Sequence, residues 1–224
     1  ETQVHQLYRW TEQHLMGESL FTYLIGLLAQ GFFSARILVQ WIMSERAKRV
    51  VNPSLFWILS VAGSYLLFIY GYIRNDFAIM LGQVISYYIY LWNLNQKGIW
   101  NRLHFIGKFI LIATPALAVF TIATNWGAFV EQCFRNEDIP LYLLIYGSLG
   151  QVIFTLRFVY QYFYSKRKNE SMLPAGFWLI SLTGSAIIVS YGIFRLDPVI
   201  ILGQSFGFVS YIRNLVISHR SKKG

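Results

Sequence analysis

The chain has few of the residues that build soluble active sites. Only 13% of its 224 residues are charged, against about 25% in a typical soluble domain. Its single cysteine, Cys133, excludes an intrachain disulfide, and the four histidines are scattered without the spacing of metal ligands. We therefore expect neither a metal centre nor a cofactor.

Acidic residues are also scarce, and none of the ten falls within the long apolar segments. Apolar residues make up 55% of the sequence, and a membrane-spanning helix needs about 20 mostly apolar residues. This pattern predicts an all-α integral membrane protein with seven transmembrane helices and no separate soluble domain. The seven segments are residues 20–43, 54–73, 77–95, 104–124, 140–164, 174–194 and 198–217.

The basic residues behind the net charge of +9 are distributed unevenly between the two sides of the predicted membrane. Most lysines and arginines lie in alternate connections between the apolar segments, and such connections face the cytoplasm under the positive-inside bias. This places an N-terminal tail, residues 1–18, outside the cell and a C-terminal tail, residues 218–224, inside it. The expected surroundings are a membrane and not nucleic acid. The basic connections hold Arg46, Lys48, Arg49, Lys97, Arg102, Lys166, Arg167, Lys168, Arg220, Lys222 and Lys223.

The chain contains an internal repeat. A shift of 121 residues places residues 26–94 on residues 147–215 without a gap. Each copy carries three apolar segments, so a further helix at 104–124 is needed to return the chain across the membrane and keep the copies parallel. The predicted organisation is a first repeat (20–95), a connecting helix and outer loop (96–139) and a second repeat (140–217), a three-plus-one-plus-three arrangement.

Positions identical in both copies recur every three or four residues, so they share one face of each helix. The polar ones would each cost several kcal/mol if they faced hydrocarbon unpaired, so we expect them to face the bundle. Two interpretations stay open: a framework of interhelical hydrogen bonds, or the lining of a cavity for a hydroxyl-rich ligand. These residues are Gln30, Gln40, Gln83, Asn93 and their copies Gln151, Gln161, Gln204 and Asn214.

Arg36 and its copy Arg157 are the sharpest signal. At about 1.5 Å per residue, Arg36 lies about 10 Å below the last turn of its helix, where a charge costs about 2.5 to 3.5 kcal/mol. No carboxylate occurs within the spans to pair with either arginine. They either bond to backbone or amide groups or snorkel to water, or they bind an anion from outside the protein, and a phosphate fits the guanidinium fork best.

Arg74 with Asp76, and Arg195 with Asp197, fall in the short outer turn between the second and third helices of each copy. We expect an interfacial ion pair within each turn, worth less than about 1 kcal/mol. The same residues are candidates for an outer gate or a contact with lipid headgroups.

The repeated pattern resembles the lipid-A biosynthesis N-terminal domain (LAB_N) family of membrane proteins. The family takes its name from fusions to lipid-A-disaccharide synthase and is similar in repeat architecture to SWEET and PQ-loop transporters. Its members accompany glycosyltransferases that make or use polyprenyl-phosphate sugars, which implies a bacterial inner membrane. In the first copy the resemblance is carried by Gln30, Phe33, Arg36, Gln40, Trp41, Ser44, Glu45, Pro53, Phe56, Trp57, Ser60, Gly63, Tyr70, Arg74, Asp76, Gly82 and Gln83.

Three functions remain after these observations. The first is a transporter or flippase for a polyprenyl-phosphate-linked sugar or a related anionic glycolipid, with Arg36 and Arg157 on the phosphate. The second is a SWEET-like facilitator of free sugar, and the third is a non-catalytic membrane subunit of a glycosyltransferase. Because the spans contain no carboxylate pair, metal cluster or Ser/His or Cys/His constellation, we expect that the chain is not an enzyme.

Overall fold

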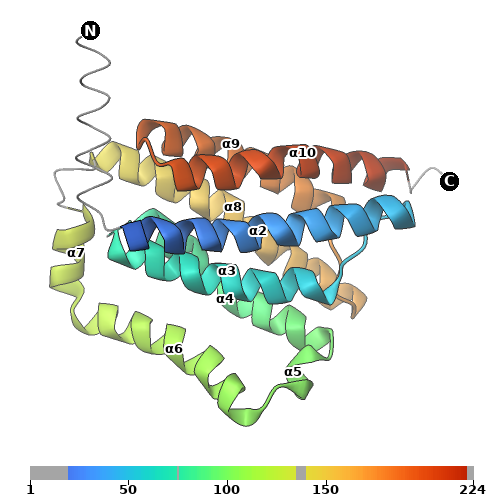
Figure 1. The fold of residues 1–224 in the computed structure, drawn as a ribbon, viewed down its shortest axis with the longest axis horizontal. Coiled ribbons are helices and arrows are strands. Elements are labelled where there is room, and N and C mark those ends of the chain that lie inside the picture. The colour runs from blue at the N-terminus through green and yellow to red at the C-terminus, as the bar shows by residue number, and fades with distance from the viewer. Residues whose placement is uncertain (1–19, 75, 135–139, 221–224) are drawn as a thin grey trace, which may run out of the picture.

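The computed structural model describes residues 20–74, 76–134 and 140–220, and every regular element in these ranges is a helix (Figure 1). The predicted tail at 1–18 lies outside the described residues. The helices are α2 (Leu20–Ala47), α3 (Ser54–Ile73), α4 (Phe77–Gln96), α5 (Ile99–Arg102), α6 (Phe105–Thr124), α7 (Trp126–Phe134), α8 (Leu141–Lys168), α9 (Ala175–Phe194) and α10 (Pro198–Arg220).

Six long helices pack as a closed ring around a central axis. Within each copy the first helix packs on the second and the second on the third, so α2, α3 and α4 are matched by α8, α9 and α10. The ring closes where α4 packs on α8 and where α10 packs on α2. This order relates the copies by an approximate two-fold axis, which exchanges equivalent helices.

The two copies also turn their chains alike. Lys48 and its equivalent Asn169 both adopt a left-handed backbone, with φ of 53° and 52°, after which the chain leaves the long first helix. Pro53 and Pro174 then precede α3 and α9 in an extended conformation. Proline suits a helix start, because the first N–H groups of a helix have no intrahelical partner.

The membrane character that the composition predicted is confirmed. Six helices, α2, α3, α6, α8, α9 and α10, are long and apolar enough to cross a membrane. The outer surface carries large apolar side chains such as Phe109 and Phe194, and the interior holds aromatic pairs such as Trp57 and Trp178. The seventh predicted span, α4, is a 20-residue helix that is not among these six, so its crossing stays a prediction.

Helix α6 lies apart from the ring (Figure 1). None of its residues is buried, although it is among the most hydrophobic of the candidate spans. Its position agrees with the segment 104–124, which has no counterpart in the repeat. Pro115 lies in its middle.

The connection after α6 was predicted as a loop, and this is wrong for residues 126–134, which form α7. Trp126 and Phe129 lie three residues apart, on one face of a helix, and their rings are 5.6 Å apart. Phe129 is buried against Met80 and reaches the ring of Phe77 at 6.1 Å. Burial of Phe129 against α4 explains why the segment folds.

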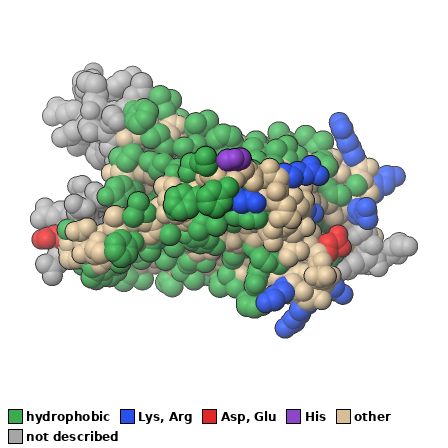
Figure 2. Space-filling view, turned by 90° about the horizontal axis from the view of Figure 1, so that it is seen from below, with side chains coloured by type: hydrophobic (Ala, Val, Ile, Leu, Met, Phe, Trp, Pro, Cys, Tyr) green, Lys and Arg blue, Asp and Glu red, His purple; other side chains and the backbone are tan. Residues whose placement is uncertain are grey.

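Basic side chains gather at the end of the molecule where α2 and α8 end, whereas the sides of the bundle are mostly apolar (Figure 2). Most of the basic connections named above are at this end, including Arg46 and Lys166 in the last turns of helices. Charge is thus kept off the surface that would face hydrocarbon.

Glycine substitutions test how closely the helices pack. An alanine Cβ at Gly184 would lie 2.6 Å from the backbone Cα of Phe154, whereas at the equivalent Gly63 its nearest neighbour is the movable ring of Phe33 at 2.9 Å. We expect Gly184→Ala to destabilise the protein by about 1 to 3 kcal/mol and Gly63→Ala by less. Thermal unfolding in detergent measures both.

The control is Gly31→Ala, because nothing lies within 4 Å of a Cβ at this position and alanine favours the helix. If Gly184→Ala unfolds at the same temperature as Gly31→Ala, the described packing of α8 on α9 is wrong.

Candidate functional site

The polar residues shared by the copies occupy three levels along the ring axis. At one end lies an ion-pair layer, and near the opposite, basic end lies an amide layer. Between them is an arginine cavity that contains Arg36 and Arg157. The ion-pair layer consists of Arg74, Asp76, Arg195 and Asp197, and the amide layer of Gln40, Asn93, Gln161 and Asn214.

The amide layer joins the two copies by reciprocal hydrogen bonds. Gln40 Nε2 donates to Asn214 Oδ1 at 2.8 Å, and Asn214 Nδ2 donates back to Gln40 Oε1 at 3.0 Å. Gln161 and Asn93 repeat this exchange at 2.9 and 3.1 Å. All four side chains are buried, so they pair with each other as a framework and do not line the cavity.

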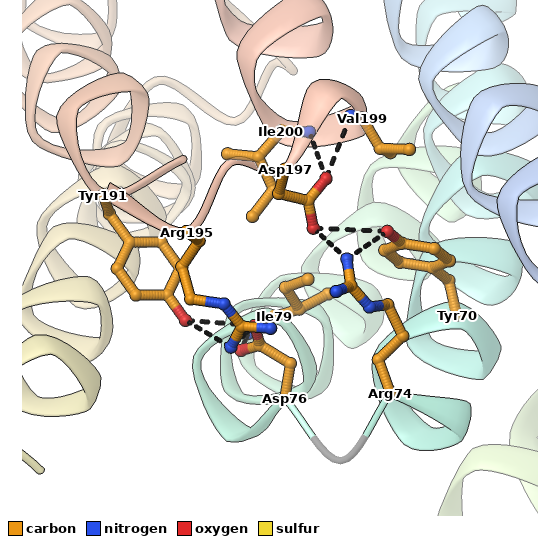
Figure 3. A network of polar contacts seen from close by, with 9 residues as sticks. All are labelled: Tyr70, Arg74, Asp76, Ile79, Tyr191, Arg195, Asp197, Val199 and Ile200. Carbon is orange, nitrogen blue, oxygen red and sulfur yellow. Dashed lines mark hydrogen bonds and ion pairs between the residues drawn. The ribbon is translucent and has the colours of Figure 1, made fainter. Parts of the chain in front are cut away.

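The ion-pair layer also crosses between the copies (Figure 3). Arg74 pairs with Asp197, and Arg195 pairs with Asp76 at 3.2 Å. Both carboxylates are almost fully buried and each also accepts a tyrosine hydroxyl from the other copy: Tyr70 donates to Asp197 at 3.2 Å, and Tyr191 to Asp76 at 3.0 Å. The layer is therefore a dense network and not a set of surface pairs.

The predicted pairing within each turn, Arg74 with Asp76 and Arg195 with Asp197, is thus wrong. Each aspartate uses one oxygen to cap its own following helix: Asp76 Oδ1 accepts from the N–H of Ile79 at 3.1 Å, and Asp197 Oδ1 accepts from that of Ile200 at 3.2 Å. Capping fixes the carboxylate so that its second oxygen points across the axis. The arginine of the other copy lies there.

The arginine cavity lies on the axis and has a volume of about 50 Å³. This is room for a few water molecules and far less than the roughly 300 to 1,000 Å³ of a site that encloses a drug-sized ligand. All six ring helices contribute to its wall. Of the predicted site residues the cavity brings together Gln30, Arg36, Gln83, Gln151, Arg157 and Gln204.

Neither arginine is saturated by the protein. Arg36 Nη1 donates to Ser60 Oγ at 2.8 Å, and Arg157 Nη1 donates to the equivalent Ser181 Oγ at 3.4 Å and to Tyr211 Oη at 3.2 Å. Among the described residues, no carboxylate pairs with either group, and the Nε of each is buried without a hydrogen-bond partner. A guanidinium has five N–H donors, so these hydrogen bonds use only part of the donor capacity of each arginine, and both residues line the cavity.

Aromatic rings supply the remaining surroundings of the two charges. The guanidinium carbon of Arg36 lies 4.4 Å from the ring centroid of Phe33, and that of Arg157 lies 3.3 Å from Phe154 and 4.5 Å from Phe158. Such cation–π contacts are worth about 2 kcal/mol when desolvated. They hold the cations in place and leave their N–H edges available.

Two of the glutamines reach across to the other copy. An added Cβ at Gly203 would lie 2.0 Å from Gln30 Oε1, and one at Gly82 would lie 2.7 Å from Gln151 Oε1. The glycines shared by α4 and α10 therefore leave the space that these amides occupy. The sequence alone does not show that these glycines make room for a glutamine, because the contact depends on how the two copies pack.

The hydroxyl partners of the arginines, Ser60, Ser181 and Tyr211, were not among the predicted site residues. All three lie at positions that are identical in both copies and on the shared faces. That identity was the available signal, because a hydroxyl on a shared face opposite a buried arginine is a natural acceptor. In the part of the chain that the structure describes, no His, Cys, Asp and Glu cluster could hold a metal ion.

The family model named Lipid A Biosynthesis N-terminal domain matches the chain twice, at residues 25–95 and 146–216. The chain belongs to this family. The two matches fall on the two copies of the repeat. No solved structure matches the chain.

Curated relatives carry the name lipid-A-disaccharide synthase. Those of Chlamydia felis and Chlamydia trachomatis (serovar D) are each 32% identical over 212 residues, and that of Chlamydia pneumoniae is 32% identical over 206. The matches cover 90% of this chain but only 34 or 35% of those proteins. The chain thus spans about a third of the length of the relatives it matches.

These names overturn the prediction that the chain is not an enzyme. The relatives match 90% of the chain and are named for an enzyme activity. That prediction relied on the absence of acid, base and metal groups from the spans. Such an absence describes this stretch of sequence and carries no information about the remaining two thirds of the relatives.

A double-mutant cycle tests the crossed ion pairs. We expect Arg74→Gln and Asp197→Asn to show a coupling free energy of about 1 to 3 kcal/mol, because Arg74→Gln leaves the buried carboxylate of Asp197 without its arginine. Asparagine keeps the oxygen that caps α10. The cycle is measured by thermal unfolding of the four proteins in detergent.

The matched comparison is the cycle of Arg74→Gln with Asp76→Asn, the two neighbours in one turn. A larger coupling for Arg74 with Asp76 than with Asp197 would contradict the crossed arrangement.

Proposed function

We propose that this chain binds a phosphate-bearing glycolipid of lipid A biosynthesis in the arginine cavity and moves its headgroup across the inner membrane. The observation that carries the proposal is the pair of buried guanidinium groups, Arg36 and Arg157, that face one cavity without a carboxylate partner in the described residues. A polyprenyl-phosphate sugar is the substrate class that the family resemblance favours.

An anionic ligand fits the electrostatics of this site. Two like charges near one axis repel each other, and neither has the protein counter-ion that a buried arginine ordinarily requires. A phosphate oxygen shared between Arg36 and Arg157 would accept from the free N–H edges and cancel the repulsion. A neutral sugar would satisfy the amides Gln30, Gln83, Gln151 and Gln204 but leave both charges uncompensated.

The layers on either side of the cavity supply the two gates of an alternating-access cycle. The ion-pair layer closes one end and the amide layer closes the other, and every pair in them joins one copy to the other. A rocking of one three-helix copy against the other would break one layer and keep the second. The small cavity then corresponds to a state closed at both ends.

This mechanism uses the full predicted topology. Helix α4 is the seventh span, α6 returns the chain so that the copies are parallel, and the basic end lies in the cytoplasm with the ion-pair layer outside. The proposed localisation is a bacterial inner membrane, with the N-terminus outside and the C-terminus inside.

The relatives' names favour a second candidate, a membrane unit that presents a phosphorylated glycolipid to a lipid-A-disaccharide synthase. Their similarity to this chain covers a third of proteins named for that activity. In this case the arginine cavity binds the lipid headgroup, and the glycosyltransferase is the partner. The two candidates share the site and differ in whether the headgroup crosses the membrane.

Replacing both arginines tests the shared step. We expect Arg36→Gln with Arg157→Gln to weaken binding of a polyprenyl phosphate at least tenfold, because each charge-assisted hydrogen bond is worth about 1.5 to 3 kcal/mol. The melting temperature should stay the same or rise, since the buried charges no longer need compensation. Ligand titration and thermal unfolding of the detergent-solubilised protein measure the two effects.

The control is Arg46→Gln, which removes an exposed arginine from the same helix, α2. Flipping of the labelled lipid in vesicles then separates the candidates: movement that is lost in the double variant supports the transporter, and binding without movement supports the presenting unit. Unchanged binding in the double variant sinks both.

A further inference from the structure

A groove outside the ring separates α6 from α3 and α4. It has a volume of about 250 Å³ and its wall is almost entirely apolar. Aromatic side chains of the first copy and the middle of α6 line it. Its lining includes Tyr65, Tyr72, Tyr87, Tyr88, Pro115 and Ala118.

The groove belongs to the first copy alone. The tyrosines at 65, 72, 87 and 88 have no tyrosine at the equivalent positions of the second copy, where the residues are Ala186, Ile193, Phe208 and Val209. Because the two copies agree at so many interior positions, this difference marks a feature of the first copy, on the side where α6 lies.

Two of these tyrosines attach α6 to the ring at its proline. Pro115 has no N–H, so the carbonyl of Leu111, four residues earlier, lacks its helical donor. Tyr87 Oη donates to this carbonyl at 2.9 Å, and Tyr88 Oη donates to that of Ile112 at 3.3 Å. Helix α6 is therefore held over the groove at two points, although it has no buried residue.

Two polar atoms at the otherwise apolar groove have no hydrogen-bond partner among the described residues. They are Ser64 Oγ and Gln83 Oε1, and both are buried. In the second copy the equivalent atoms bond to each other, Ser185 Oγ to Gln204 Oε1 at 2.9 Å. The first copy holds this pair apart.

Gln83 also lines the arginine cavity, so this side chain borders both the central cavity and the lateral groove. On the cavity side of Gln83 are the two cations, and on the groove side is an apolar channel beside a surface that faces lipid. This sequence of environments matches a molecule with an anionic head and a hydrocarbon tail.

Building on the proposed function, we propose that the groove between α3, α4 and α6 is a lateral portal that holds the hydrocarbon chain of the glycolipid while its phosphate lies at Arg36 and Arg157. Gln83 lies at the junction, where its unpartnered oxygen accepts from a hydroxyl or amide of the headgroup. Helix α6 then covers the chain and shields it from other lipids.

Filling the groove tests the portal. Ala118→Trp places an indole in it, and we expect this change to weaken binding of farnesyl phosphate about tenfold, the effect of excluding roughly two methylenes. Binding of inorganic phosphate, which has no chain, should be unchanged. Both affinities are measured by titration of the full chain in detergent micelles.

Ala116→Trp is the matched control, because Ala116 is exposed on α6 and does not line the groove. Equal weakening of farnesyl phosphate binding by both tryptophans would overturn the portal. So would an Ala118→Trp variant that binds farnesyl phosphate as the unaltered protein does.

A photoreactive probe tests the unaltered protein, in case the tryptophan prevents folding. Farnesyl phosphate with a diazirine at the end of its chain should label peptides of α4 and of the Thr114–Thr121 part of α6, as mapped by mass spectrometry. Labels confined to helices other than α3, α4 and α6 overturn the portal.

The arginine variants separate this proposal from the function on which it rests. If Arg36→Gln with Arg157→Gln weakens both probes while Ala118→Trp weakens neither, the phosphate site stands and the portal fails. If the arginine variant binds both probes normally while the label stays in the groove, the phosphate site fails and the chain site stands.

Discussion

The ring is built around two positive charges held inside it. Burying an arginine without a counter-ion is costly, and here it is done twice, in equivalent places. The serines and aromatic rings around Arg36 and Arg157 compensate part of this cost and position the groups. They leave the Nε atoms without partners. A fold that only needed stability would use apolar residues at these positions, since they pack as well and need no compensation.

The approximate two-fold symmetry also relates the contacts within the ion-pair layer and within the amide layer, on either side of the arginines. In both layers the ion pairs and the amide exchanges join one copy to the other, although some of the same residues also form hydrogen bonds within their own copy, such as Gln40 with Ser44. Hydrogen bonds and ion pairs have preferred geometries and break over short displacements. Close-packed apolar interiors resist deformation. Two rigid three-helix units joined by breakable polar contacts are well suited to a rigid-body motion about the shared axis.

The internal repeat let the sequence predict much of this. Shared positions at helical spacing identified the inward faces, and Arg36, Arg157 and four of the glutamines do line one cavity. The crossed pairs of Arg74 and Arg195 were not predictable, because the nearest carboxylate in sequence is two residues away and the true partner is set by the packing of the copies. Helix α7 was missed because its stability comes from contacts of Phe129 with residues far along the chain. The groove was not predictable from the sequence, because it is formed by the position of α6 against α3 and α4.

The two copies differ in the contacts that join the first helix of one copy to the third helix of the other. At the amide end, α2 and α10 are joined by an ion pair of Glu45 with Arg213, while the equivalent contact of α8 with α4 is an aromatic one, with the rings of Tyr162 and Trp92 4.6 Å apart. An exposed ion pair contributes little and depends on salt, whereas a ring pair adds its own area of apolar burial. The two interfaces thus differ in their chemistry at this end. Helix α4 also carries the tyrosines that hold α6, so the groove lies on the side of the ring that has the aromatic contact.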